Sequence, residues 1–186
     1  MAEPAIVVRD AIESDIPQVT RIYAHHVLYG LASFEETPPS SDEMLSRFRA
    51  VTAAAFPYLV AESGGRIVGY SYASSYRSRP AYRFTVEDSV YVSDDVRGKG
   101  VGSQLLGTLI DRCEAGAWRQ MLAVIGDSAN IGSIALHGRF GFRLAGSLTS
   151  VGFKHGRWID SVIMQRPLSS GDAAKPVLSA PPESLL

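Results

Sequence analysis

A glycine-rich turn at residues 97–102 is the part of this sequence best suited to hold a phosphate. It reads Arg-Gly-Lys-Gly-Val-Gly and lies between an alternating run, 85–92, and an apolar-periodic segment that extends to Gly116. Glycines let the backbone approach a ligand, and a helix start presents unpaired N–H groups and a favourable dipole to an anion. Arg97 and Lys99 add positive charge. The turn is therefore predicted to be an anion site.

The elements that must position this turn predict an α+β fold. Short apolar or alternating runs predict strands at 6–9, 58–61, 67–72, 84–92, 121–125, 142–150 and 158–166. Helical spacing predicts helices over 14–27, 40–48, 100–116 and 130–140, with Ser14 and Ser40 as N-caps and Gly64-Gly65 as a hairpin turn. Because strands and helices alternate irregularly around hairpins, we expect a mixed sheet. Residues 1–168 are predicted to form one domain, and 169–186 a disordered, proline-containing tail.

Composition narrows the class of protein. The chain has 186 residues, of which 46% are hydrophobic and 20% charged, as in soluble domains. A net charge of −1 argues against bulk binding to nucleic acid or anionic membranes. No run reaches membrane-spanning length and no signal peptide is evident, so we expect a cytoplasmic location. Cys113 is the only cysteine and lies at helical spacing with leucines, which favours a core position, and no histidine pair has metal-ligand spacing, so we expect no metal.

The spacing of the glycines excludes two nucleotide motifs. Gly98, Gly100 and Gly102 alternate, which fits neither the Gly-x-Gly-x-x-Gly fingerprint nor the Gly-x-x-x-x-Gly-Lys-Ser/Thr loop. The turn does match Gln/Arg-x-x-Gly-x-Gly/Ala, filled by Arg97, Gly100 and Gly102. The chain therefore resembles the Gcn5-related N-acetyltransferase (GNAT) superfamily, whose motif holds the pyrophosphate of acetyl-CoA.

Further segments extend this resemblance over about residues 5–168 and narrow it to the phosphinothricin and methionine sulfoximine acetyltransferase group. The matching segments are 56–61, Ala81-Tyr82, Thr85-Val86-Glu87, 89–92, the Asn130 to Phe142 region and 152–158. The resemblance implies the GNAT fold, a mostly antiparallel mixed sheet flanked by helices on both faces. It also implies a homodimer, with the 154–158 hairpin as a contact.

Acetyl transfer to an amine needs a base for the ammonium and a proton for the leaving thiolate. The resemblance carries the family's catalytic glutamate to Glu87, acting directly or through a water, whereas spacing alone favours an edge-strand carboxylate facing solvent. His137 lies where many relatives place a tyrosine near the CoA sulfur, so it is either a proton donor or a helix histidine bonded to a backbone carbonyl.

The acceptor is expected to be a small-molecule amine that carries an anionic group. The residues assigned to its binding are Phe34, Arg77, Arg79, Tyr82, Arg83 and Ser89. Arginine forks recognise carboxylates and phosphinates, and Arg77, Arg79 and Arg83 match basic positions of the group, although scattered arginines are usually surface charge. Tyr82 and Phe34 are predicted as apolar walls, with core packing as the alternative.

The acetyl-CoA site is expected to extend from the strand before the turn to the helix after Asn130. The residues assigned to it are Val90, Tyr91, Val92, Arg97, Gly98, Lys99, Gly100, Val101, Gly102, Ser103, Asn130 and Ser133. Asn130 has two compatible roles, a bond to the pantetheine arm and the N-cap of its own helix.

The sequence thus favours transfer of acetyl from acetyl-CoA to a phosphinothricin- or methionine sulfoximine-type amino acid, with resistance to such compounds as a consequence. The alternative acceptors are another small amine or a protein N-terminus. A CoA-binding sensor without turnover is the alternative from a different class, and the presence of Glu87, His137 and the arginines disfavours it.

Overall fold

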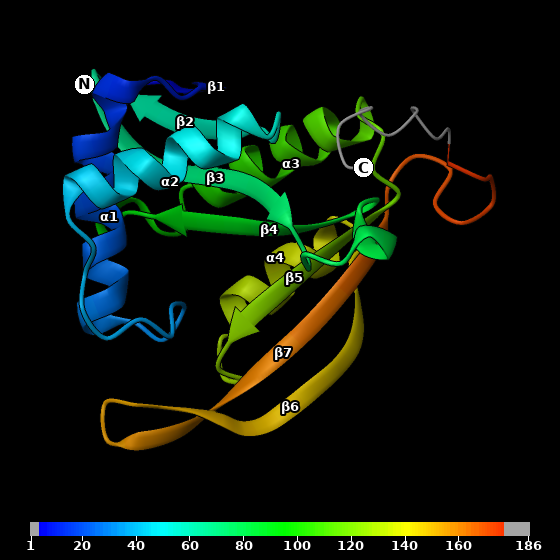
Figure 1. Cartoon of the computed structure of the whole chain (residues 1–186). Coiled ribbons are helices and arrows are strands. Elements are labelled where there is room, and N and C mark those ends of the chain that lie inside the picture. The colour runs from blue at the N-terminus through cyan, green and yellow to red at the C-terminus, as the bar shows by residue number, and fades with distance from the viewer. Residues whose placement is uncertain (1–3, 177–186) are drawn as a thin grey trace, which may run out of the picture.

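The computed structural model describes residues 4–176, within which seven strands form one open sheet (Figure 1). The sheet order is β1-β2-β3-β4-β5-β7-β6, and only the β4–β5 pair is parallel. The strands are β1 (Ile6–Asp10), β2 (Tyr58–Ser63), β3 (Arg66–Ser75), β4 (Thr85–Val92), β5 (Gln120–Gly126), β6 (Arg143–Lys154) and β7 (Arg157–Pro167).

Helices cover both faces of the sheet, as the resemblance implied. They are α1 (Ile16–Tyr29), α2 (Ser41–Ala53), α3 (Val101–Glu114) and α4 (Ile131–Arg139). One buried cluster joins α1 and α2 to the sheet through Tyr58 and Tyr70, and a second joins α3 to the other face, with α4 packed at its margin. The α+β class and the mixed, mostly antiparallel sheet are therefore confirmed.

The strands β4 and β5 separate at the middle of the sheet, and this separation positions the site. Their parallel ladder runs from Thr85 opposite Gln120 to Asp88 opposite Ala123, and it ends there. Both strands continue beyond that point, and their arrowheads diverge in Figure 1. The edge of β4 beyond Asp88 that faces β5 consequently has no strand partner, so the main-chain polar groups of Val90 on this edge are available to a ligand.

Local signals in the sequence placed most of the element ends to within one or two residues. Ser40 caps α2 by accepting a hydrogen bond from the Glu43 N–H at 3.1 Å, and Gly64 and Gly65 form the β2–β3 turn with φ of 59° and 77°. The prediction that Ser14 is an N-cap was wrong, because Ser14 lies inside a 3₁₀ turn, Glu13–Asp15, that precedes α1. The carboxylate of Asp15 is committed elsewhere, to the Arg9 guanidinium at 2.7 Å and 2.9 Å and to the Ile12 N–H.

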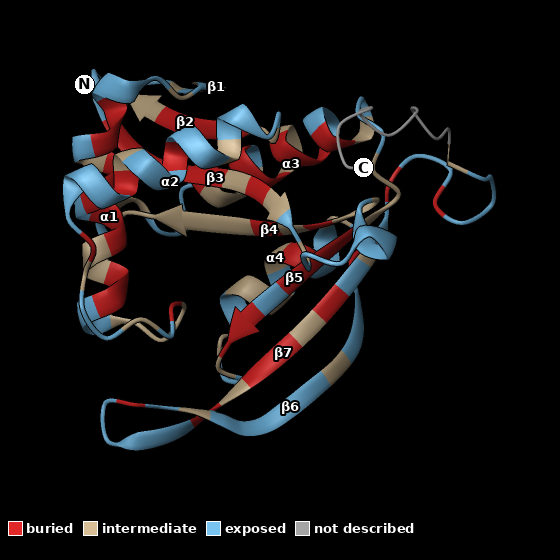
Figure 2. Cartoon of the chain, viewed as in Figure 1, coloured by how far each residue is buried: buried red, intermediate tan, exposed pale blue. Residues whose placement is uncertain are grey.

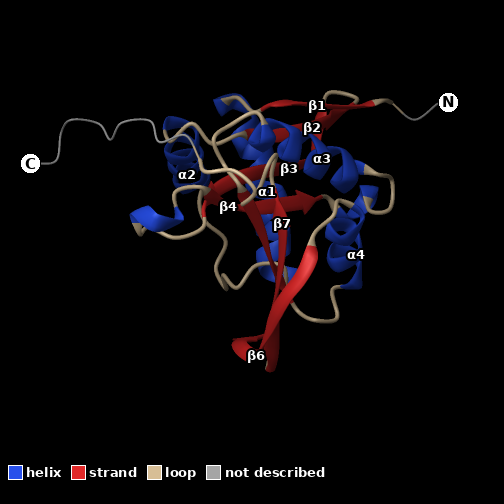
Figure 3. Ribbon diagram, turned by 90° about the vertical axis from the view of Figure 1, so that its right-hand side faces the viewer, coloured by secondary structure: helices blue, strands red, loops and turns tan. Residues whose placement is uncertain are grey.

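Burial separates the core from one exposed edge (Figure 2). Cys113 is fully buried on α3, as predicted, and burial raises the pKa of its thiol to about 12. Strand β6 is exposed along most of its length, and Figure 3 shows the β6–β7 hairpin projecting from the body of the molecule. Among residues 4–176, no helix has the length and apolar character needed to cross a membrane.

The chain continues beyond β7 into the segment that was predicted to be a tail. Leu168 is fully buried in the main cluster, and residues 169–173 form turns in which the Ser169 hydroxyl donates to the Glu114 carbonyl. The rest of the predicted tail, 177–186, lies outside the described residues.

Candidate active site

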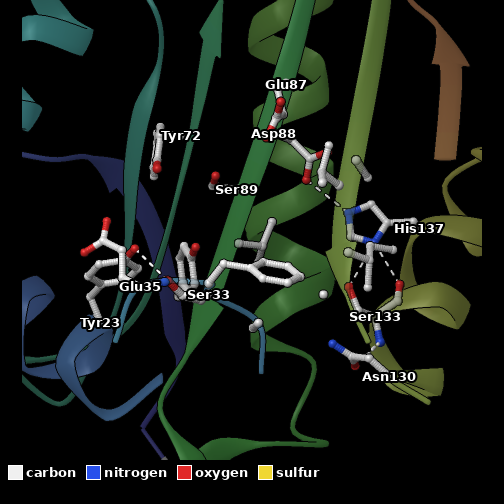
Figure 4. A pocket seen from close by; sticks show the side chains of 18 residues that line it. Tyr23, Ser33, Glu35, Tyr72, Glu87, Asp88, Ser89, Asn130, Ser133 and His137 are labelled. Atoms are coloured by element: carbon white, nitrogen blue, oxygen red, sulfur yellow. Dashed lines mark hydrogen bonds and ion pairs between the residues drawn. The ribbon is translucent and has the colours of Figure 1, made fainter. Parts of the chain in front are cut away.

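A cavity of about 490 Å³ opens where β4 and β5 separate. Figure 4 shows its walls, which come from β3, β4, β5, α1, α4 and the loop between α1 and α2. The lining residues are Tyr23, Ala32, Ser33, Phe34, Glu35, Tyr72, Glu87, Asp88, Ser89, Val90, Tyr91, Ala123, Val124, Ile125, Gly126, Asn130, Ser133 and His137. The cavity therefore brings together Glu87 and His137, which the sequence assigned to catalysis. It also contains some of the residues assigned to acetyl-CoA and some of those assigned to the acceptor amine.

Glu87 is a half-buried carboxylate on the wall that β4 provides. It makes no hydrogen bond or ion pair within residues 4–176. Burial and, secondarily, the negative charge of Asp88 raise the pKa of Glu87 above 4.5, because both disfavour its ionised form. A carboxylate without a partner and with a raised pKa has the properties of a general base.

His137 is buried on α4 with both ring nitrogens engaged. Its Nδ1 lies 2.7 Å from the Ser133 carbonyl oxygen, and its Nε2 lies 3.0 Å from Asp88 Oδ2. The hydrogen bond to a backbone carbonyl, which the sequence offered as the alternative to a proton donor, is thus present. The ring also contacts Asp88, a partner that the sequence did not reveal. Burial lowers the pKa of His137, the Asp88 carboxylate and the Ser133 carbonyl raise it, and the net direction is upward.

Asn130 begins the helix that carries His137. Its side-chain oxygen accepts a hydrogen bond from the Ser133 N–H at 3.2 Å, so the N-cap role is confirmed. The Asn130 and Ser133 side chains also line the cavity, so the predicted contact of these residues with acetyl-CoA stays a prediction.

The loop between α1 and α2 forms the wall opposite His137, and two contacts fix it to β6. The Lys154 ammonium donates to the Ser33 carbonyl at 2.7 Å, and burial lowers the pKa of Lys154. The Phe34 ring lies so close to the Gly152 backbone that a Cβ at that position would stand 1.9 Å from Phe34 Cε1. Phe34 is therefore a wall of the cavity, and it retains 42% of its surface exposure.

The glycine turn has the backbone shape of an anion cradle. Gly98 and Gly100 have φ of 78° and 83°, the left-handed region that glycine tolerates, and Gly100 occupies the N-cap position of α3 without a side-chain cap. The N–H groups of Val101, Gly102 and Ser103 have no partner within residues 4–176. An ideal Cβ on Gly98 or Gly100 would meet no atom within 4 Å, so the turn faces open space. These features fit a phosphate at the helix start.

The charges around this turn are arranged differently from a simple basic patch. The Arg97 guanidinium lies 2.7 Å from Asp94 Oδ1, and the same carboxylate contacts His25 at 2.8 Å. A further basic residue, Arg139 of α4, donates to the Ser103 hydroxyl at 3.3 Å. Arg139 thus lies beside the helix start, although nothing in its sequence position indicated this.

The three strand residues assigned to the acetyl-CoA site, Val90, Tyr91 and Val92, differ in the groups that they present to a ligand. Val90 and Tyr91 line the cavity, and the Tyr91 ring packs against Tyr23 and Tyr70 with centroids 5.1 Å away in each case. The Tyr91 main chain is paired with Tyr70 in the β3–β4 ladder, because the flanking bonds from Ser93 N–H to the Val68 carbonyl and from Tyr76 N–H to the Thr85 carbonyl place the odd-numbered residues of β4 on the β3 side. The main-chain groups that face the cavity are therefore those of Val90. Val92 lines a separate, smaller cavity, and its carbonyl already accepts a hydrogen bond from His26 Nε2 at 3.0 Å.

The predicted acceptor residues of the β3–β4 connection lie outside the cavity. Arg77, Arg79, Tyr82 and Arg83 are all exposed, and none is a lining residue. The Arg77 guanidinium stacks 5.8 Å from the Tyr82 ring centroid, and Arg83 donates to the Pro80 carbonyl. Of the acceptor set, only Phe34 and Ser89 contribute to the cavity itself.

Several cavity residues carried no sequence signal. Because successive side chains of a strand alternate, Asp88 lies on the face of β4 opposite Glu87, and it reaches the cavity because the β4–β5 ladder ends beside it. Tyr23, Glu35 and Tyr72 come from elements far apart in the chain. Within residues 4–176, no group of three or more histidine, cysteine, aspartate or glutamate residues is placed to bind a metal.

A divided sheet with a glycine turn at the start of α3 and a polar cavity between its halves defines an acyl-CoA-dependent transferase. The family model described as an acetyltransferase (GNAT) domain matches residues 8–163, and the chain belongs to this family. It is 56% identical to the phosphinothricin N-acetyltransferase of Alcaligenes faecalis, over 95% of this chain and 89% of the relative. It is 41% identical to the L-methionine sulfoximine/L-methionine sulfone acetyltransferase of Pseudomonas paraeruginosa, over 94% and 98% of the two chains. The crystal structure of a phosphinothricin acetyltransferase from Sinorhizobium meliloti in complex with acetyl-CoA superposes with a TM-score of 0.91, at 50% identity over 97% of each chain.

Proposed function

We propose that this enzyme transfers acetyl from acetyl-CoA to the primary amine of a small anionic amino acid of the phosphinothricin or methionine sulfoximine type. The relatives named above act on such compounds, and the chain spans nearly all of their length. The observation that carries the proposal is the unpaired Glu87 carboxylate, which stands in the cavity beside the open edge of β4. Acetylation of such a compound would make its host resistant to it.

The donor side is supported by the backbone of the chain. The unpaired N–H groups at the start of α3 suit the pyrophosphate, and the open edge of β4 at Val90 suits the pantetheine arm. Asn130 and Ser133 border the same cavity from α4. Acetyl-CoA supplies the thioester, whose carbonyl carbon is the electrophile.

The acceptor side divides the chemistry between two groups. Glu87 takes a proton from the acceptor ammonium, directly or through a water, and the freed nitrogen forms a C–N bond to the thioester carbon. The C–S bond then breaks and its electron pair leaves on sulfur. Protonated His137, which lines the same cavity, assists departure of the thiolate by its positive charge, while its two N–H groups remain on Asp88 and the Ser133 carbonyl. The proton that neutralises the thiolate comes from solvent.

The anionic group of the acceptor requires a cation that the cavity lining lacks apart from His137. We propose that Arg77, Arg79 and Arg83, which are exposed on the connection before β4, supply it, with Arg77 leaving its stack on Tyr82 and Arg83 its bond to the Pro80 carbonyl. Arginine binds carboxylates and phosphinates in a bidentate geometry, which would orient the amine toward Glu87.

The direct test is release of free thiol from acetyl-CoA in the presence of a panel of amines. We expect phosphinothricin and methionine sulfoximine to give release, and neutral amines of similar size to give much less. A preference for a protein N-terminus or a neutral amine would replace the proposed acceptor. Binding of acetyl-CoA with no release from any amine would favour a sensor.

We also propose that the enzyme is a cytoplasmic homodimer that uses the β6–β7 hairpin. Its exposed apolar side chains, with 50–68% of their surface accessible, are Leu144, Leu148, Val151, Phe153 and Trp158. Such a projecting apolar surface favours a second copy as its cover. Sedimentation at micromolar concentration should give twice the 20.1 kDa chain mass, and a monomer would refute the dimer. The lone buried cysteine suits a reducing compartment.

A further inference from the structure

The contact between Asp88 and His137 places a proton between two buried side chains. Their side chains are 1% and 5% exposed, and Nε2 lies 3.0 Å from Oδ2. A main-chain carbonyl can only accept, so the Nδ1 that faces the Ser133 carbonyl at 2.7 Å carries a hydrogen. The Nε2 atom then meets Asp88 either as an N–H facing a carboxylate or as a lone pair facing a protonated carboxyl group.

The surroundings of the ring favour the imidazolium–carboxylate form. From β4, Asp88 contacts the ring and Glu87 stands next to it in the chain. From α3, the Cys113 thiol is neutral, because burial raises its pKa to about 12. On α4 itself, the Arg139 guanidinium is directed to Ser103. Asp88 is the charged group that acts on His137, and its negative charge stabilises a protonated ring.

Stability alone is a poor explanation for this pair. Moving two charges out of water costs free energy that a single contact often fails to recover. Oδ1 of Asp88 is buried without a hydrogen-bond partner in residues 4–176, which adds to the cost. A buried polar group that is kept at such a cost points to a role in function.

The position of the pair indicates what that role is. Asp88 is the last β4 residue in the ladder with β5, so it lies at the apex of the separation between the two strands. Its contact reaches from β4 to α4, the helix that follows β5, where main-chain pairing between β4 and β5 has stopped. The ion pair thereby ties together the two walls that carry Glu87 and His137 (Figure 4).

We propose that Asp88 is a positioning residue for acetyl transfer, which holds His137 protonated and fixes its ring on the cavity wall facing Glu87. Because this role rests on the acetyl transfer proposed above, Asp88 acts through His137 and touches neither substrate. The reaction needs Glu87 ionised and His137 protonated at the same pH. By favouring the protonated ring, Asp88 extends the range of pH in which both conditions are met.

Asp88→Asn is the informative substitution. The asparagine amide can donate to Nε2 of a neutral ring, so the contact and the packing persist while the negative charge is lost. The pKa of His137 should therefore fall, and the alkaline limb of kcat/KM should move to lower pH. A shift of one pH unit corresponds to about a tenfold loss of kcat/KM above the new limb, with near wild-type activity below it. The KM for acetyl-CoA should change less than about twofold, which is well under 1 kcal/mol.

Two measurements make the proposal falsifiable. Titration of His137 by ¹H–¹⁵N NMR should show a ring with two N–H groups at neutral pH in the wild type and a lower pKa in Asp88→Asn. Glu114→Gln, which removes a partly buried carboxylate from its contact with Arg166, is the matched control and should leave both profiles unchanged. A neutral His137 in the wild type overturns the proposal, and so does an unmoved alkaline limb in Asp88→Asn.

The wild-type titration also covers the case in which Asp88→Asn fails to fold, since it reads the ion pair without any substitution. The wild-type titration also distinguishes failure of the Asp88 proposal from failure of the proposed acetyl transfer. Absence of thiol release with every amine would remove acetyl transfer while leaving the titration of His137 as it is.

Discussion

Replacement of Gly100 by alanine isolates the role of the glycine turn. Gly100 has φ of 83°, and an L-residue in this left-handed region costs about 1–2 kcal/mol relative to glycine. The new Cβ would meet no atom within 4 Å, so no steric clash adds to that cost. For a domain of this size, about 1 kcal/mol lowers Tm by roughly 2–4 °C. Gly100→Ala should therefore unfold only a few degrees below the wild type.

Binding of acetyl-CoA should suffer more than stability. Gly100 stands at the N-cap of α3, directly before the unpaired N–H groups of Val101, Gly102 and Ser103. The methyl group enters the open space through which a phosphate must approach those groups. We expect the Kd for acetyl-CoA to rise at least about tenfold, equivalent to roughly 1.4 kcal/mol.

Gly65→Ala is the matched control. Gly65 also has a positive φ, 77°, with no atom within 4 Å of an ideal Cβ, but it lies in the β2–β3 turn and lines no part of the cavity. Both variants should lose similar Tm in thermal denaturation, and calorimetric titration should show weakened acetyl-CoA binding only for Gly100→Ala. Equal affinity in the two variants would refute the assignment of the turn to the pyrophosphate.

Three other substitutions test the rest of the site. Glu87→Gln should lower kcat by about 10²-fold or more with little change in acetyl-CoA affinity, as expected for loss of a general base. Because the folded pKa of Glu87 is raised and the base must be ionised, wild-type kcat/KM should fall with decreasing pH from above 4.5, and a limb at or below 4.5 would exclude Glu87. Arg77→Ala should raise KM for an anionic acceptor but not for its neutral amide analogue, so equal KM changes would move the acceptor site elsewhere. Gly152→Ala should displace the Phe34 ring and lower the free energy of unfolding by about 1–3 kcal/mol. The KM for the acceptor should then rise, whereas the Kd for acetyl-CoA should stay unchanged.

Features with a local cause were predictable from the sequence. The left-handed glycines of the turn, the Ser40 N-cap and the Gly64-Gly65 hairpin each depend on a few neighbouring residues. Alternation along β4 likewise placed Glu87 and Ser89 on one face and Asp88 and Val90 on the other. Ser14 shows the limit of such signals, since a 3₁₀ turn precedes α1 and its N-cap position is Asp15, whose carboxylate is paired with Arg9, rather than Ser14.

The composition of the cavity depended on contacts between distant segments. Phe34 lies against Gly152, and Lys154 reaches the Ser33 carbonyl across 121 residues of chain. The arginines between β3 and β4 matched the family pattern, yet the fold leaves them exposed and outside the lining of the cavity. Their role consequently depends on side-chain movement that the sequence pattern does not specify.

The sequence by itself determined the family, the donor motif and the order of the elements, because glycine spacing and hydrophobic periodicity act over short stretches of chain. Only the tertiary structure decided how His137 is held. Strand alternation places the Asp88 side chain on the face of β4 opposite Glu87. The ladder between β4 and β5 ends at Asp88, and α4 places His137 Nε2 3.0 Å from Asp88 Oδ2. The state of that imidazole depends on a charge 49 residues away in the chain, and no local pattern records such a distance.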